Sequence, residues 1–194
     1  MQKRVFIIHG WEGRPGEHWM PWLRKKLEAS SYEVIEPTMP DTNEPIIEKW
    51  VSHLASVVGD LDENTYFVGH SVGCQTILRY LETHVGKKAG GCVFVAGWFK
   101  LGNLESEDIE KIAEPWVKGD MDFTKILKTT KNFIVINSSN DDYDFVQENK
   151  KMFEEKLGAR VTILENKGHL IEADGVTELP EALAAVQEFA MSGH

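Results

Sequence analysis

The fold of this chain is decided by the stretch Tyr66-Phe67-Val68-Gly69-His70-Ser71-Val72-Gly73, in which an apolar run leads into Gly-x-Ser-x-Gly and then into a helical pattern. This spacing is typical of a sharp strand-to-helix turn, where the flanking glycines leave room that Cβ atoms would fill. The turn exposes the serine hydroxyl at the start of a helix, whose dipole favours a developing negative charge. We therefore expect Ser71 to be a nucleophile and the backbone N–H of Val72 to be an oxyanion donor. An ordinary glycine-rich turn is the alternative for the five-residue pattern alone.

Strands and helices alternate on both sides of this stretch. Short, β-branched apolar runs typical of strands buried on both faces occupy residues 5–8, 33–35, 66–68, 92–95, 133–136 and 161–164. Apolar residues recur at helical spacing between them, in residues 19–27, 46–54, 76–81, 145–157 and 179–189. The alternation predicts an α/β fold in one domain over residues 1–194, with an open, mostly parallel sheet of about six strands and helices on both faces. Residues 97–131 contain no clear strand and are expected to form a small cap over the site.

The partners of Ser71 are expected just after later strands, because parallel sheets bind ligands at the carboxyl ends of their strands. A serine hydroxyl needs a general base, and the base needs a third group to orient it. In hydrolases with this serine turn the chain order is Ser, acid, His. His169 follows the last predicted strand and is the expected base. Asp141, Asp142 and Asp144 all follow the strand at 133–136, so each is a candidate for the acid.

The first strand ends in His9-Gly10-Trp11-Glu12-Gly13, and the backbone N–H of Trp11 is expected to be the second oxyanion donor. A simple connecting loop is the alternative for this segment. A phosphate-binding loop is disfavoured, because the segment matches neither Gly-x-Gly-x-x-Gly nor a P-loop with its Lys and Ser/Thr. Among the six tryptophans, Trp98 and Trp116 are candidates for lining a substrate pocket.

Composition narrows the classes of partner. The formal net charge of −10 disfavours nucleic acid and anionic membrane surfaces. The Cys74 and Cys92 side chains fall inside predicted elements, which suits a reducing compartment. No apolar run approaches the roughly 20 residues that span a bilayer, and the N-terminal apolar run is too short for a signal peptide. We expect a cytoplasmic protein. No metal-ligand motif is present in the sequence, so we expect neither a metal nor a cofactor.

Several motifs together resemble the small serine hydrolases related to retinoblastoma-binding protein nine and to bacterial YdeN. The likeness covers nearly the whole chain and is carried by residues 7–11, 18–23, 39–40, 63–66, 69–74, 139–142 and 168–169. It implies an α/β-hydrolase fold without the first two strands of larger members, and a Ser–Asp–His triad. Its acid is the second Asp of an Asp-Asp pair, which here is Asp142, with Asp141 as the alternative. The chain contains no Leu-x-Cys-x-Glu sequence, so binding to the retinoblastoma protein is not implied.

These features predict hydrolysis of a small-molecule acyl substrate, with a small carboxylic ester as the first expectation. Amides, thioesters and peptides remain open, because the same catalytic groups serve all of them. The first rival is a non-catalytic interaction module that has kept the hydrolase scaffold, since a fold does not prove an activity. The second is a nucleotide-binding protein with a similar parallel sheet. The sequence does not indicate a protein partner or an oligomeric state.

Overall fold

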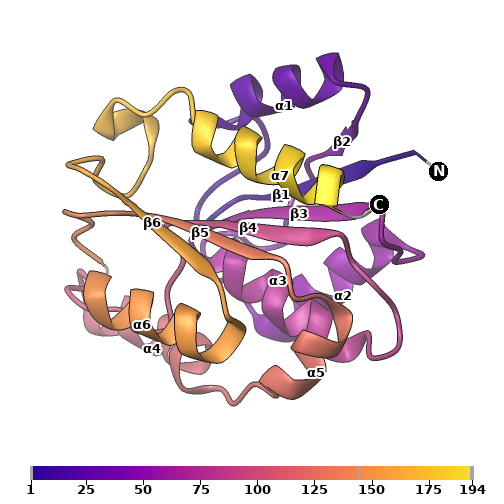
Figure 1. Cartoon of the computed structure of the whole chain (residues 1–194). Helices are drawn as coiled ribbons and strands as arrows, with labels where there is room; N and C mark the ends of the chain where they lie inside the picture. The colour runs from indigo at the N-terminus through magenta and orange to yellow at the C-terminus, as the bar shows by residue number, and fades with distance from the viewer. Residues whose placement is uncertain (1, 144, 193–194) are drawn as a thin grey trace.

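The fold is organised around one parallel sheet. The structure is a computed structural model that describes residues 2–143 and 145–192. Six parallel strands form the sheet in the order β2-β1-β3-β4-β5-β6 (Figure 1). Their bounds are β1 Arg4–Ile8, β2 Glu33–Ile35, β3 Thr65–His70, β4 Gly91–Val95, β5 Phe133–Ser138 and β6 Arg160–Leu164. The predicted α/β class and the predicted six-stranded sheet are confirmed.

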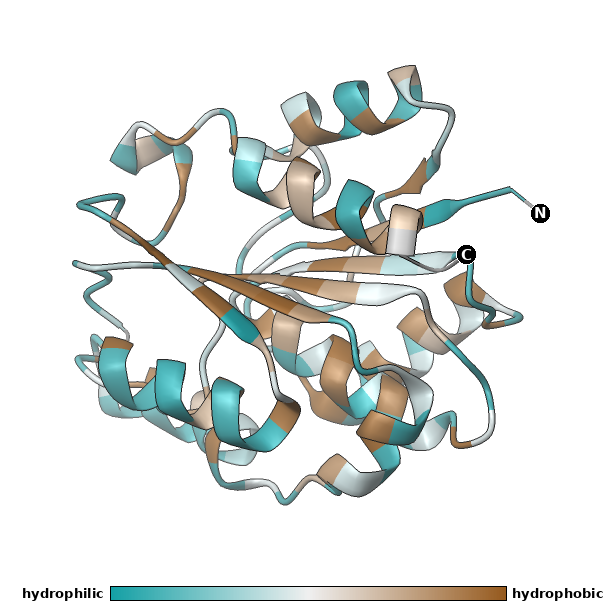
Figure 2. Cartoon of the chain, viewed as in Figure 1, coloured by the Kyte–Doolittle hydropathy of each residue, from teal (hydrophilic) through white to brown (hydrophobic). Residues whose placement is uncertain are grey.

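Helices cover both faces of the sheet. One face carries α1 (Met20–Ala29) and α7 (Pro180–Ser192). The other carries α2 (Ile47–Val58), α3 (Val72–Thr83), α5 (Phe123–Thr129) and α6 (Val146–Leu157), with α4 (Glu107–Lys118) beside them (Figure 1). Within β1, the side chains of Val5 and Ile7 pack on the face covered by α1 and α7, whereas those of Phe6 and Ile8 pack on the other face. Successive side chains of a strand point to opposite faces of the sheet. The central strands therefore carry apolar residues on both faces, as the brown colour along much of their length shows (Figure 2).

The strand order places a binding crevice beside β1. The chain proceeds from β1 to β2 on one side and then returns to β3 on the other, so the loops that follow β1 and β3 diverge to opposite faces. Such switch points leave a crevice at the carboxyl ends of the strands. The start of β1 and the end of α7 lie at the opposite edge of the sheet (Figure 1). Ser71 follows β3 directly, and Trp11 lies three residues after β1.

The segment predicted to be a cap divides into two parts. Leu101, Leu104, Glu105 and Ile109 border the crevice, whereas the C-terminal part of α4 is held against α3. The buried Arg79 guanidinium of α3 holds it by donating from Nη2 to the Trp116 carbonyl oxygen at 2.9 Å. Arg79 also donates to the carbonyl oxygens of Gly119 and Asp120, both at 3.5 Å.

Trp116 is a core residue. Its side chain is buried, its indole donates to the Pro45 carbonyl oxygen at 2.9 Å, and its ring packs edge-on against Trp50. The expectation that Trp116 lines the substrate pocket is wrong. The residue occupies the face of α4 that packs into the core, and it is not among the residues that border the crevice.

The described residues contain no helix whose length and hydrophobicity would allow it to cross a lipid bilayer. Both cysteines are free thiols and both are buried, Cys74 in α3 and Cys92 in β4. Burial raises the pKa of the Cys74 thiol well above its ordinary value. Cys74 lies one helical turn after Ser71, yet it is a buried, protonated packing group and does not compete with Ser71 as a nucleophile.

Candidate active site

Ser71 occupies a strained turn between β3 and α3. Its backbone has φ 53° and ψ −120°, a conformation that costs a non-glycine residue free energy and is typical of functional sites. The two flanking glycines make the turn possible. A Cβ at Gly69 would lie 2.8 Å from the Cys74 nitrogen, and a Cβ at Gly73 would collide with the Ile8 carbonyl oxygen. The Ser71 N–H donates to the Val95 carbonyl oxygen at 2.9 Å, which fixes the turn to β4.

The imidazole of His169 is oriented by Asp141. His169 Nδ1 lies 2.7 Å from Asp141 Oδ2, and the Asp141 side chain is 1% exposed. The second oxygen of this carboxylate, Oδ1, accepts the backbone N–H of Tyr143 at 3.1 Å. Because Nδ1 donates to the carboxylate, the neutral ring has its free lone pair on Nε2. This is the tautomer that a general base for a serine requires.

The structure corrects the choice of acid. Asp142 was the expected partner of His169, but Asp142 is exposed, and its backbone carbonyl oxygen accepts the Asn103 side-chain amide at 2.7 Å. Asp141, the alternative, is buried and contacts the imidazole. The loop after β5 turns the two neighbouring side chains in different directions, so only one of them reaches His169. Asp144, the third candidate, lies outside the described residues.

Hydrogen bonds to several other segments hold the loop that carries His169. His70, which precedes Ser71, donates from Nε2 to the His169 carbonyl oxygen at 3.0 Å. The His169 N–H donates to Asp174 Oδ2 at 2.8 Å, and the Gly168 N–H donates to Asn140 Oδ1 at 2.9 Å. Burial lowers the pKa of His70 to about 3, so its ring is neutral and serves as a fixed donor.

Two backbone amides at the crevice are available to an oxyanion. Val72 is the first residue of α3, where helix N–H groups have no helical partner. Across the described residues, neither the Trp11 N–H nor the Val72 N–H donates a hydrogen bond to the protein. Both residues border the pocket, as the predicted oxyanion role requires.

The His9 side chain fixes the peptide that carries the Trp11 N–H. His9 Nε2 accepts the Met39 N–H at 3.1 Å, so Nδ1 holds the proton and donates to the Gly10 carbonyl oxygen at 2.9 Å. The Gly13 N–H also donates to this oxygen. In a trans peptide the C=O and the following N–H point in opposite directions. Holding the Gly10 carbonyl therefore fixes the direction of the Trp11 N–H.

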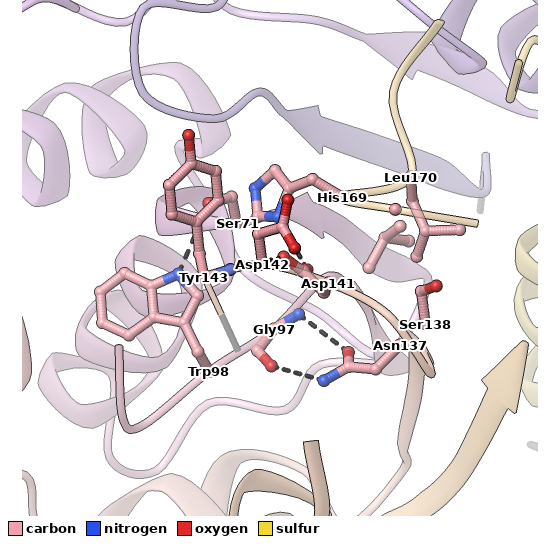
Figure 3. Close-up of polar contacts among 12 residues, drawn as sticks. Ser71, Gly97, Trp98, Asn137, Ser138, Asp141, Asp142, Tyr143, His169 and Leu170 are labelled. Carbon is pink, nitrogen blue, oxygen red and sulfur yellow. Dashed lines mark hydrogen bonds and ion pairs between the residues drawn. The ribbon is translucent and has the colours of Figure 1, made fainter. Parts of the chain in front are cut away.

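Trp98 contacts the serine hydroxyl. Its indole Nε1–H donates to Ser71 Oγ at 3.4 Å (Figure 3), and its carbonyl oxygen accepts a short hydrogen bond from Gln75. Trp98 borders the pocket, and its predicted role in binding substrate stays a prediction. Among the described residues, no hydrogen bond joins Ser71 Oγ to His169. Such bonds are often long in ligand-free sites and shorten when substrate binds.

The pocket above Ser71 has a volume of about 340 Å³ and is bordered by Trp11, Trp98, Leu101, Leu104 and His169, among others. Sequence reasoning missed Tyr143, whose ring lies edge-on to the His169 ring at 5.4 Å (Figure 3). The Tyr143 hydroxyl donates to Glu105 Oε1 at 3.1 Å. Tyr143 therefore links the loop after β5 to the segment before α4. The only local signal was its place directly after the Asp pair.

Comparisons with known proteins find relatives along nearly the whole chain. The model of a family described as serine hydrolase matches residues 5–188. The putative hydrolase YdeN of Bacillus subtilis (strain 168) is 35% identical over 182 residues, which cover 93% of this chain and 92% of YdeN. The crystal structure of the B. subtilis ydeN gene product superposes with a TM-score of 0.87 at 31% identity, over 98% of this chain and 100% of that one. Serine hydrolase RBBP9 of Rattus norvegicus is 24% identical over 163 residues, which cover 83% of this chain and 78% of RBBP9.

Proposed function

This chain belongs to the serine hydrolase family, and from that premise we propose that it hydrolyses a small carboxylic ester through a triad of Ser71, His169 and Asp141. The observation that carries the proposal is that the serine and the imidazole border the same pocket. A serine hydroxyl on a strained turn and an imidazole oriented by a buried carboxylate border one pocket. A serine turn without an oriented base would leave the hydroxyl a poor nucleophile at neutral pH.

The proposed reaction proceeds by two acyl transfers. Ser71 Oγ attacks the ester carbonyl carbon while His169 Nε2 takes the hydroxyl proton, and the N–H groups of Trp11 and Val72 bind the oxyanion that forms. The intermediate then collapses, and the imidazolium donates its proton to the departing alcohol. A water molecule, activated by the same imidazole, releases the acid from the acyl-enzyme. Asp141 stabilises the imidazolium in both halves of the reaction.

The pocket favours an uncharged acyl group. Trp98, Leu101 and Leu104 provide apolar surface, and among the described residues that border the pocket there is no Lys or Arg to pair with an anionic substrate. Glu105 stands at the same border. A carboxylate on the acyl group would have to be desolvated near that charge without a cationic partner. We therefore propose a neutral, apolar acyl group of modest size.

The test is labelling of the purified protein with a fluorophosphonate, read by intact mass and peptide mapping. We expect one adduct, on Ser71, which disappears in Ser71→Ala and becomes much slower in His169→Ala. Hydrolysis of p-nitrophenyl butyrate is expected to follow the same order. A folded wild-type protein that is not labelled and does not hydrolyse the ester would contradict the proposal and favour a non-catalytic module.

A further inference from the structure

His18 borders the same pocket as Ser71 and His169, but it belongs to the loop between β1 and α1. Its backbone has φ 57°, a left-handed conformation that costs a residue with a Cβ free energy. The surrounding structure therefore holds the residue in place at a cost, as is common where a side chain serves a ligand site. No step of the proposed reaction uses His18.

The proton of the His18 ring is on Nε2. The backbone N–H of Glu172 donates to His18 Nδ1 at 3.2 Å, so Nδ1 is an acceptor. Burial lowers the pKa of His18, against an opposing effect from the carboxylates of Glu17 and Glu172. The ring is therefore a neutral imidazole near pH 7, with one fixed acceptor and one N–H donor.

The Nε2–H of His18 is unpaired and accessible. Within the described part of the chain it has no hydrogen-bond partner, and it is not among the buried side-chain atoms that lack one. The atom is therefore accessible, and the residue that carries it borders the pocket. Ligand pockets combine apolar walls with a few placed polar groups that fix orientation, and an unpaired, neutral donor is such a group.

His18 lies on the His169 side of the pocket. Its ring is 5.9 Å from the His70 ring, which is 5.1 Å from the His169 ring. Glu172, which fixes the tautomer, follows His169 by three residues. The alcohol takes its proton from the base, so it leaves on the side of His169.

We propose that His18 Nε2–H donates a hydrogen bond to an oxygen atom in the alcohol part of the substrate. The site therefore selects esters of alcohols that carry a further acceptor oxygen over esters of plain hydrocarbon alcohols. This inference rests on the proposed ester hydrolysis and adds to it the chemical class of the leaving group. A site built to donate to a substrate discriminates against an analogue that lacks the acceptor, because its own polar group is then left unpaired.

The test compares 2-methoxyethyl butyrate with n-butyl butyrate, which have the same acyl group and the same chain length but differ in one acceptor oxygen. For the wild-type protein we expect kcat/KM to be about fivefold higher for the methoxyethyl ester, the effect of one net hydrogen bond. His18→Asn is the informative variant. Asn tolerates a left-handed backbone, and its amide oxygen can accept the Glu172 N–H, but it lacks a donor at the position of Nε2. The preference should disappear in this variant.

His18→Gln is the matched control. The longer amide places an N–H donor near the position of Nε2, so we expect it to restore much of the preference. Fluorophosphonate labelling of Ser71 in each variant shows that the nucleophile is intact. Equal kcat/KM values for the two esters in wild type, or an unchanged ratio in His18→Asn, would overturn the inference while labelling left the proposed function standing. Loss of both hydrolysis and labelling in wild type would overturn both.

Discussion

His169 Nδ1 lies 2.7 Å from Asp141 Oδ2, while the neighbouring Asp142 is exposed to solvent. Two adjacent Asp residues therefore have different surroundings. The Asp141 carboxylate accepts hydrogen bonds from the His169 imidazole and from the Tyr143 backbone N–H. At Asp142 it is the backbone carbonyl oxygen that accepts a hydrogen bond, from the Asn103 side-chain amide. Replacing each Asp by Asn makes the same chemical change at both positions, so any difference between the two variants reports on position alone.

Asp141→Asn is expected to lower kcat for p-nitrophenyl butyrate by roughly 10³-fold to 10⁴-fold, because an amide does not hold the imidazole in the productive tautomer. Asp142→Asn, the matched control, is expected to stay within about twofold of wild type, as is usual for an exposed side chain outside the site. Steady-state kinetics on the two variants decides between the carboxylates. A large loss in Asp142→Asn with little change in Asp141→Asn would mean that the loop rearranges when substrate binds.

His70 is expected to act as a positioning residue for His169. In His70→Phe the donor to the His169 carbonyl oxygen is lost, and we expect kcat to fall about tenfold with little change in KM, since a small displacement of the base raises the barrier to the chemical step. His70→Gln retains an N–H donor and should recover most of kcat. Equal losses in the two variants would show that the ring packing, and not the hydrogen bond, is what matters.

The same histidine is expected to make stability depend on pH. Its pKa is lowered to about 3 in the folded protein and returns to about 6.5 when the chain unfolds. The unfolded state therefore binds more protons between these values. The contribution of His70 is complete above pH 6.5 and is lost as the pH falls from 6.5 toward 3.

We expect the free energy of unfolding to fall by about 1 kcal/mol more per pH unit in wild type than in His70→Gln, between pH 6 and pH 5. Urea denaturation at a series of pH values measures this difference. His18 and His9 also have lowered pKa values, but they are present in both proteins and cancel in the comparison. Parallel pH dependences of the two proteins would contradict the burial of a neutral His70.

Arg79 is expected to contribute to stability through α4. Arg79→Met removes the donors to the carbonyl oxygens of Trp116, Gly119 and Asp120, and we expect a loss of about 2 to 4 kcal/mol in the free energy of unfolding. Lys111→Met is the control, because Lys111 forms a surface ion pair with Asp108 on the same helix that is worth less than about 1 kcal/mol. Urea denaturation measures both. Similar, small losses would show that water replaces the Arg79 contacts without cost.

Local patterns were sufficient for the scaffold and for two members of the site. The strands of a doubly covered parallel sheet are short and apolar throughout, and the helices between them carry a single apolar stripe, so each element is visible in its own residues. Ser71 follows from the spacing of Gly69 and Gly73 around it, because the turn needs both glycines wherever the rest of the chain lies. His169 follows from chain order, since it is the histidine placed directly after the last strand.

The remaining features depend on contacts between residues far apart in the sequence. The choice of Asp141 over Asp142 is set by the direction in which the loop after β5 leaves the sheet toward residue 169. The burial of Trp116 is set by which face of α4 meets the core, and the exposed donor of His18 by a backbone N–H at residue 172. Sequence by itself determined the scaffold and the positions of the proposed nucleophile and the proposed base, because these are properties of short segments. Only the tertiary structure decided the proposed acid, the pocket wall and the donor proposed for His18, because each of these is a relation between loops that the sheet brings together.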